Sequence, residues 1–117
     1  MHADFATKAA SADEAVKVIQ SGDRVFVHGA SATPSALIDA LCRRTDLRDV
    51  TLYHLHTTGS HDFVDPSQAG RLFSVSLFTG HGLRGPIACG RADFMPVFLS
   101  DIPGLFLNRT IELDVAL

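Results

Sequence analysis

Short apolar segments with the composition of β-strands alternate along this chain with helical segments and turns. The clearest strand-like segments are rich in β-branched and aromatic residues and lie at residues 24–28, 50–56 and 72–78. Two further strands are expected over residues 95–100 and from about residue 110 onward. Strands that alternate with helices need crossover connections, which make the strands parallel. The pattern therefore predicts an α/β fold: an open, mostly parallel sheet of about five strands with helices on both faces.

Helix signals lie between these strands. Ser11 and Glu14 form a capping-box pattern, which predicts a helix that starts there and ends at Gly22. Thr33 is expected to cap a second helix, with Pro34 at its first position. A third helical segment follows the glycine-rich turn after the third strand, and a short fourth helix precedes the last strand.

Size and charge exclude several classes of protein. The chain has 117 residues, 46 % of them hydrophobic, and a formal net charge of −3, so it suits one globular domain without a basic surface for nucleic acid. No run approaches the roughly 18 apolar residues of a membrane span. The first five residues do not resemble a secretory leader. Because Cys42 and Cys89 form no disulfide framework, a cytoplasmic location is expected.

A glycine pattern after the third strand suggests one candidate function. Gly80, Gly82 and Gly85 form G-x-G-x-x-G, the pattern of a dinucleotide-binding turn, and Asp101 lies about 20 residues further on. Pro86 follows the third glycine and weakens the helix that would hold the pyrophosphate. A turn that needs small residues, or a loop that approaches another phosphate or acyl ligand, also fits the pattern.

Polar residues also follow the first two strands. Residues 29–34 join the end of the first strand to a helix N-terminus, where ligands bind in open parallel sheets. An ordinary tight turn explains this segment as well. His54 and His56, with His61 and Asp62, have the residue types of a metal site, but their spacing matches no standard zinc pattern, so no metal is assigned. Histidines hydrogen-bonded near a pocket are the alternative.

The sequence offers no convincing nucleophile. Neither a G-x-S-x-G elbow nor a P-loop is present. Glu14 is explained by helix capping and Glu112 by a strand edge. Arg84, Arg91 and Asp93 fit structural ion pairs or the binding of an acidic ligand.

Residues 90–103 read GRADFMPVFLSDIP and resemble the G-R-A-D-[FY]-x-P-x-F-L-S-[DE]-I-P block of the acetyl-CoA hydrolase/transferase family. Other segments agree with that family. Residues 11–27 resemble its opening helix and S-G-D-x-V strand, residues 34–41 its P-x-x-L-x-x-A-L helix, and residues 114–117 the start of its D-V-A-L-I strand. Residues 78–84 are similar to its F-x-G-x-x-x-R segment. The likeness covers most of the chain.

The resemblance implies an enzyme that moves CoA between an acyl-CoA thioester and a small carboxylate such as acetate or 4-hydroxybutyrate, or that hydrolyses acyl-CoA. In that family a glutamate of a second domain attacks the thioester and becomes a glutamyl-CoA intermediate. Residues 1–117 are then expected to be the N-terminal part of a truncated N-terminal domain, inactive alone, without the catalytic glutamate. CoA thioester is a substrate, no cofactor or metal is bound, and a homo-oligomer is expected.

The same resemblance leads us to expect that the loops at the strand ends line the acyl or carboxylate side of the cleft. The expected substrate-binding residues are Gly29, Ala30, Ser31, His56, Gly59, Gly80 and Arg84. Arg84 is expected to stabilise the oxyanion of thioester attack, although a simple ion pair would also explain it. Gly85 and Pro86 depart from the family pattern, which leaves the helix after Arg84 in question. A dinucleotide-binding module and a non-catalytic binding or assembly domain remain the alternatives.

Overall fold

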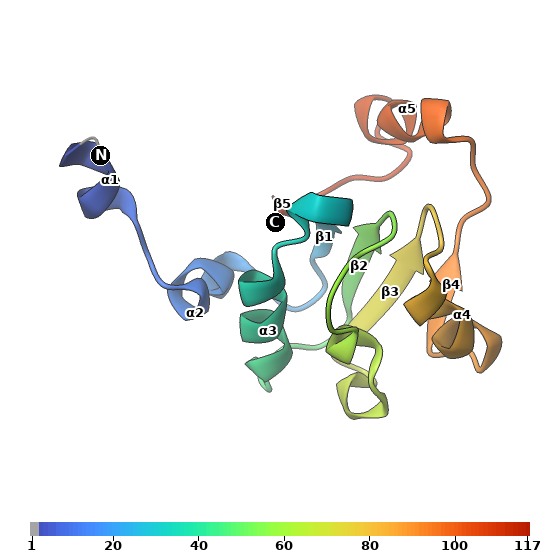
Figure 1. Cartoon of the computed structure of the whole chain (residues 1–117), viewed down its shortest axis with the longest axis horizontal. Helices are drawn as coiled ribbons and strands as arrows, with labels where there is room; N and C mark the ends of the chain where they lie inside the picture. Colours follow the sequence, from blue (N-terminus) through green and yellow to red (C-terminus); the bar gives the residue numbers. More distant parts are fainter. Residues whose placement is uncertain (1–2) are drawn as a thin grey trace.

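Five parallel strands form one sheet at the centre of the computed structural model, which describes residues 3–117 (Figure 1). The strands run in the spatial order β4-β3-β2-β1-β5, and every neighbouring pair is parallel. Their bounds are β1 Arg24–Val27, β2 Val50–His54, β3 Leu72–Ser76, β4 Ala92–Phe94 and β5 Val115–Ala116. The predicted open parallel α/β sheet is confirmed.

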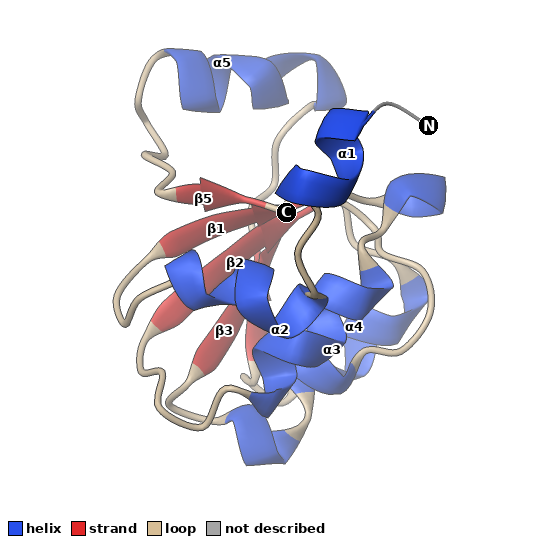
Figure 2. Cartoon of the chain, turned by 90° about the vertical axis from the view of Figure 1, so that its left-hand side faces the viewer, coloured by secondary structure: helices blue, strands red, loops and turns tan. Residues whose placement is uncertain are grey.

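Helices pack on both faces of this sheet. Figure 2 shows α2, α3 and α4 together on one side and α5 apart from them. The helices are α1 Ala3–Lys8, α2 Ala12–Ala15, α3 Ser35–Arg43, α4 His81–Ala88 and α5 Ile102–Leu107. Figure 1 shows α1 standing away from the sheet. None of the helices in the described part of the chain is long and apolar enough to cross a bilayer. Met1 and His2, part of the segment considered as a leader, lie outside the described residues.

Alternation along the strands divides the apolar residues between two clusters. In β2, the side chains of Val50, Leu52 and His54 are buried on one face, while Thr51 and Tyr53 are half-buried on the other. The first face packs under α2, α3 and α4 and forms the large hydrophobic cluster of the chain. The second face packs against α5, where the rings of Phe26 and Phe106 meet edge to face at 5.5 Å.

The fourth strand differs from the sequence prediction. It lies at Ala92–Phe94, where Ala92 pairs with Ser74 of β3, and not over residues 95–100. Residues 95–98 are not part of the sheet, and residues 99–101 form a 3-10 turn that leads into α5. The run after Phe94 is apolar because the side chains of Met95 and Val97 pack against the small cluster beside α5. Its hydrophobicity therefore reflects these contacts and not pairing in the sheet, and Phe98 is exposed.

Three helix predictions also need correction. Ser11 does cap the amide of Glu14 at 3.2 Å, but the helical segment stops at Val18, well before Gly22, and the Glu14 carboxylate pairs with Lys17. The hydroxyl of Thr33 donates to the carbonyl of Ala30 instead of capping α3.

The doubted helix after Arg84 does form. It continues through Pro86, because Leu83 is fully buried and Ile87 packs against the large cluster, which holds α4 against the sheet. Burial of this apolar side thus outweighs the local effect of the proline.

Candidate functional site

Loops from three neighbouring strands meet at the carboxyl edge of the sheet, and the backbone of His56 lies at their centre. The amide of Ala30 donates to the carbonyl of His56 at 3.0 Å. A Cβ atom on Gly29 would lie 2.6 Å from that carbonyl oxygen, and a Cβ atom on Gly80 would lie 2.9 Å from the His56 Cβ. Both positions therefore require glycine. The structure brings these four predicted site residues into contact.

Threonine hydroxyls hold the loop after β1 in an uncommon conformation. Ala30 has φ +51°, in the left-handed region that residues with a side chain rarely adopt. Its carbonyl accepts hydrogen bonds from the hydroxyls of Thr33 (2.7 Å) and Thr58 (3.1 Å). The amide of Thr58 in turn donates to the Thr33 hydroxyl at 3.1 Å. Neither threonine was predicted at the site, and only their position next to turns signalled that they might bond to the backbone.

Two more predicted residues sit on the exposed rim of these loops. Ser31 lies in the 3-10 turn Ala30–Ala32 and is exposed. Gly59 is exposed with φ +87°, and its backbone passes near Ser35. Both belong to the loops that converge here, without a hydrogen bond of their own to His56.

The seventh predicted residue, Arg84, lies in the first turns of α4. Gly80 is the N-cap of this helix and offers no side chain to the free amides that follow it. Leu83 is fully buried beside Arg84, whose side chain is exposed. Within residues 3–117, the guanidinium of Arg84 makes no hydrogen bond or ion pair. A cation and unpaired amides therefore share the end of α4 that faces the strand ends, an arrangement that suits negative charge.

His61 is a residue of this site that the sequence analysis considered only as a metal ligand. A Cβ atom on Gly82, in the first turn of α4, would lie 2.5 Å from its imidazole ring. The His61 ring also packs on Phe63, with centroids 5.9 Å apart. A side chain at position 82 would therefore displace the His61 ring, whereas one at position 80 would collide with the Cβ of His56.

His54 lies beneath the site, fully buried at the end of β2. Its Nδ1 contacts the carbonyl of Leu55, and its Nε2 lies 2.5 Å from the hydroxyl of Ser74. Burial lowers the pKa of His54 below its usual value, so the ring is neutral at physiological pH. The hydroxyls of Thr57, three residues after His54, and of Ser76, at the end of β3, are buried as well. Neither has a hydrogen-bond partner among the described residues.

The considered metal ligands are not assembled into a metal site. Across residues 3–117 no three His, Cys, Asp or Glu side chains are grouped to hold an ion. Both ring nitrogens of His54 are already occupied by Leu55 and Ser74.

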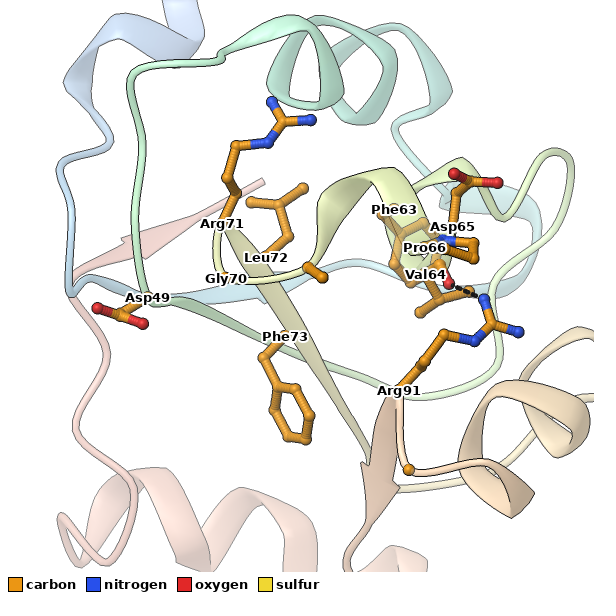
Figure 3. A pocket seen from close by; sticks show the side chains of 12 residues that line it. Asp49, Phe63, Val64, Asp65, Pro66, Gly70, Arg71, Leu72, Phe73 and Arg91 are labelled. Atoms are coloured by element: carbon orange, nitrogen blue, oxygen red, sulfur yellow. Dashed lines mark hydrogen bonds between the residues drawn. The ribbon is translucent and has the colours of Figure 1, made fainter.

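A cavity of about 380 Å³ lies elsewhere, beside the amino-terminal half of β3 (Figure 3). None of the seven predicted residues lines it. Its two arginines are already bonded: Arg91 donates to the carbonyl of Val64 at 2.7 Å, and Arg71 donates to the carbonyl of Arg44 at 2.9 Å. These bonds hold both guanidinium groups against the backbone, and the carboxylates of Asp49 and Asp65 line the same cavity, so its charge is mixed.

Comparison with known proteins gives consistent results. Residues 1–117 match the family model of the acetyl-CoA hydrolase/transferase N-terminal domain. The chain is 43 % identical over 116 residues to a succinyl-CoA:acetate/propanoyl-CoA:succinate CoA transferase of Fasciola hepatica, which covers 97 % of this chain and 24 % of that protein. It is 28 % identical over 114 residues to a 4-hydroxybutyrate coenzyme A transferase of Clostridium kluyveri, which covers 97 % of this chain and 27 % of that protein.

Solved structures support the same fold. The crystal structure of RipA from Yersinia pestis matches 96 % of this chain and 28 % of its own chain, with a TM-score of 0.80 and 24 % identity. The chain thus spans about a quarter of the length of the curated relatives that it matches.

Proposed function

The chain belongs to the acetyl-CoA hydrolase/transferase N-terminal domain family, and from this membership we propose that it is the N-terminal part of an enzyme that moves CoA between an acyl-CoA thioester and a small carboxylate. The observation that carries the proposal is the 43 % identity to a CoA transferase over 116 residues. The names of the relatives favour acetate, propionate, succinate or 4-hydroxybutyrate as carboxylates. Hydrolysis is the variant in which water replaces the acceptor.

The attacking group of this reaction lies outside these residues in our proposal. Of the two glutamates, Glu14 is exposed and paired with Lys17 at 2.6 Å. Glu112 is exposed and precedes β5, close to Asp114, whose amide donates to the carbonyl of Arg24 at the amino end of β1. A glutamate of a following domain would attack the thioester carbonyl and release CoA as the thiolate, leaving a mixed anhydride. The thiolate would then attack the glutamyl carbonyl, release the carboxylate and form glutamyl-CoA.

The loops that follow β1, β2 and β3, here called the convergent loops, would line the acyl or carboxylate side of the cleft. Gly29 and Gly80 keep this surface low, because a side chain at either position would collide with His56. Ala30, Ser31 and Gly59 would complete the rim. Arg84 and the free amides at the start of α4 would stabilise the negative charge that develops on the thioester oxygen. No bound cofactor is needed for this chemistry, since the CoA thioester is itself the substrate.

We further propose a cytoplasmic homo-oligomer that contains a second domain beyond these residues. The small number of cysteines suits a reducing compartment. Large exposed apolar side chains, among them Phe98 and Leu107, suit contacts with further protein.

The first test replaces Arg84 with Ala in the full-length enzyme. We expect kcat/KM for acyl-CoA to fall at least about tenfold, or about 1.4 kcal/mol of transition-state stabilisation, because a cation beside the oxyanion is lost. Steady-state CoA transfer to acetate is the measurement. Arg24→Ala is the matched control, since Arg24 is also an exposed arginine but lies at the amino end of β1. Equal activity of the Arg84→Ala and Arg24→Ala enzymes would remove the role of Arg84.

The dinucleotide alternative has lost its main support. The first glycine of the G-x-G-x-x-G pattern is explained by its close contact with the Cβ of His56, and the family match points to CoA chemistry. Quenching of NADH fluorescence on binding, without any response to CoA thioesters, would restore that alternative.

A further inference from the structure

The buried ring of His54 has a defined tautomer. A carbonyl oxygen only accepts hydrogen bonds, so the contact with Leu55 requires a proton on Nδ1. The neutral ring then carries its lone pair on Nε2, and the Ser74 hydroxyl, 2.5 Å away, donates to it. Residue His54 is only 1 % exposed, so water does not compete for either bond.

The bond to Leu55 lies next to the centre of the candidate site. It fixes the carbonyl of Leu55, and thereby the plane of the peptide that leads into His56. The next carbonyl, that of His56, accepts from the amide of Ala30 at 3.0 Å and lies against Gly29. Rotation of the 55–56 peptide would therefore move the atoms on which the loop after β1 rests.

The same ring is linked to the start of α4 through aromatic contacts. Phe63 packs edge to face against His54, with ring centroids 5.5 Å apart and an interplanar angle of 81°. Phe63 also contacts the ring of His61, which in turn lies against Gly82. Gly82 is two residues from Arg84, so His54 is connected to both sides of the site.

We propose that His54 is a positioning residue, whose Nδ1–H, held in place by Ser74 at Nε2, orients the loop from residue 55 to 61 for substrate. The proposal rests on the proposed CoA-transfer function and assigns His54 no contact with substrate. Its role is to present the His56 backbone to Gly29, Ala30 and Gly80, and to support the first turn of α4.

The experiment uses three variants of the full-length protein. His54→Phe keeps a flat ring for Phe63 but removes both hydrogen bonds. His54→Asn keeps a donor at the position of Nδ1 and removes the acceptor for Ser74. Ser74→Ala leaves the ring and the Leu55 contact in place, and it covers the possibility that His54→Phe does not fold.

Hydrogen exchange of residues 29–33, measured by mass spectrometry, reads the position of the loop. Exchange of residues 36–43 in α3 serves as the internal reference for overall stability. In His54→Phe we expect exchange of 29–33 to rise at least about tenfold relative to the reference. The effect should be smaller in Ser74→Ala, and His54→Asn should restore most of the protection. In the wild-type protein, ¹⁵N-histidine NMR should show His54 as the neutral Nδ1–H tautomer.

Activity forms an independent arm. CoA transfer in His54→Phe is expected to fall at least about tenfold in kcat/KM and to recover in His54→Asn. Unchanged relative exchange in both His54→Phe and Ser74→Ala, an equal rise in both segments, or the Nε2–H tautomer would each overturn the proposal. Absence of CoA transfer in the wild-type protein would instead refute the proposed function, and the exchange and NMR results would still decide the role of His54.

Discussion

The face of the sheet beneath α2, α3 and α4 and the face beneath α5 carry different amounts of buried apolar surface. The first face contributes to a cluster that extends from Val16 in the 3-10 turn after α2 to Ala92 in β4. The second cluster has three buried members, Leu77, Ile102 and Ile111, surrounded by partly buried side chains. Phe73, on the second face, remains 41 % exposed.

This difference shows which face contributes more to the stability of the chain. The burial of apolar surface that drives folding is concentrated on the first face. The second face leaves more apolar surface exposed, which fits the proposal that further protein packs there. The candidate site lies at the carboxyl edge of the sheet. Its loops are supported from the first face, because Phe63 and Leu83 beside them belong to the large cluster.

The largest expected effect is on the first cluster. Leu52 lies in the central strand β2 and is 1 % exposed, so Leu52→Ala leaves a cavity that the neighbouring strands cannot fill. We expect the free energy of unfolding to fall by about 3 kcal/mol. Urea unfolding followed by circular dichroism measures it. Leu107→Ala is the matched control, because Leu107 is 82 % exposed. A loss as small as that of the control would break the comparison.

A smaller effect is expected on the second cluster. Ile102 begins α5 and is buried, but most of its neighbours are only partly so, and they can move into the space left by Ile102→Ala. We expect a loss of about 2 kcal/mol, at the lower end of such substitutions. The same unfolding measurement applies. A loss greater than that of Leu52→Ala would show that the face beneath α5 contributes equally to stability.

Mild acid should lower the free energy of unfolding through protonation of His54, which is buried on the first face. Burial lowers the pKa of its imidazole in the folded chain below the ordinary value of 6.5, so the unfolded chain binds more protons between the two pKa values. The stabilising contribution is complete above the unfolded pKa and is lost as the pH falls below it. We expect the free energy of unfolding to fall between about pH 7.5 and 5.5, and to fall less in His54→Phe. Equal pH dependence of both proteins would exclude this origin.

The smallest effect is expected from the surface ion pair between α2 and the 3-10 turn that follows it. Lys17 pairs with Glu14 at 2.6 Å, but their side chains are 65 % and 60 % exposed. Lys17→Ala should lower the free energy of unfolding by less than about 0.5 kcal/mol, and high salt should reduce the difference. Salt titration of the unfolding midpoint checks both. A loss above about 1 kcal/mol would mean that charge, as well as burial, holds this segment to the first face.

Local patterns predicted the parts of the fold that local chemistry decides. The β-branched segments around Val25, Leu52 and Val75 are strands in the structure, and their alternation with helices gives the parallel sheet. The last strand and β4 were misplaced. A strand as short as Ala92–Phe94 has almost no pattern of its own and is fixed by pairing with Ser74 and its neighbours.

The candidate site was predicted in part for the same reason. Gly29 and Gly80 were found because strand ends in a parallel sheet meet at one edge. Thr58 and His61 were missed because their contacts with Ala30 and Gly82 join loops that are distant in sequence. Thr33 bonds locally to Ala30 but also accepts from the amide of Thr58, which the sequence could not indicate.

The sequence alone determined the α/β architecture, the family resemblance and the edge of the sheet at which the polar loops gather. These follow from hydrophobic period, turn chemistry and connection rules, which act over a few residues at a time. The tertiary structure decided that His56 is the centre of the loops and that His54 is buried and neutral beneath it. It also decided that Arg84 has no hydrogen-bond or ion-pair partner among residues 3–117. Each of these depends on distances between segments that only the packed sheet brings together.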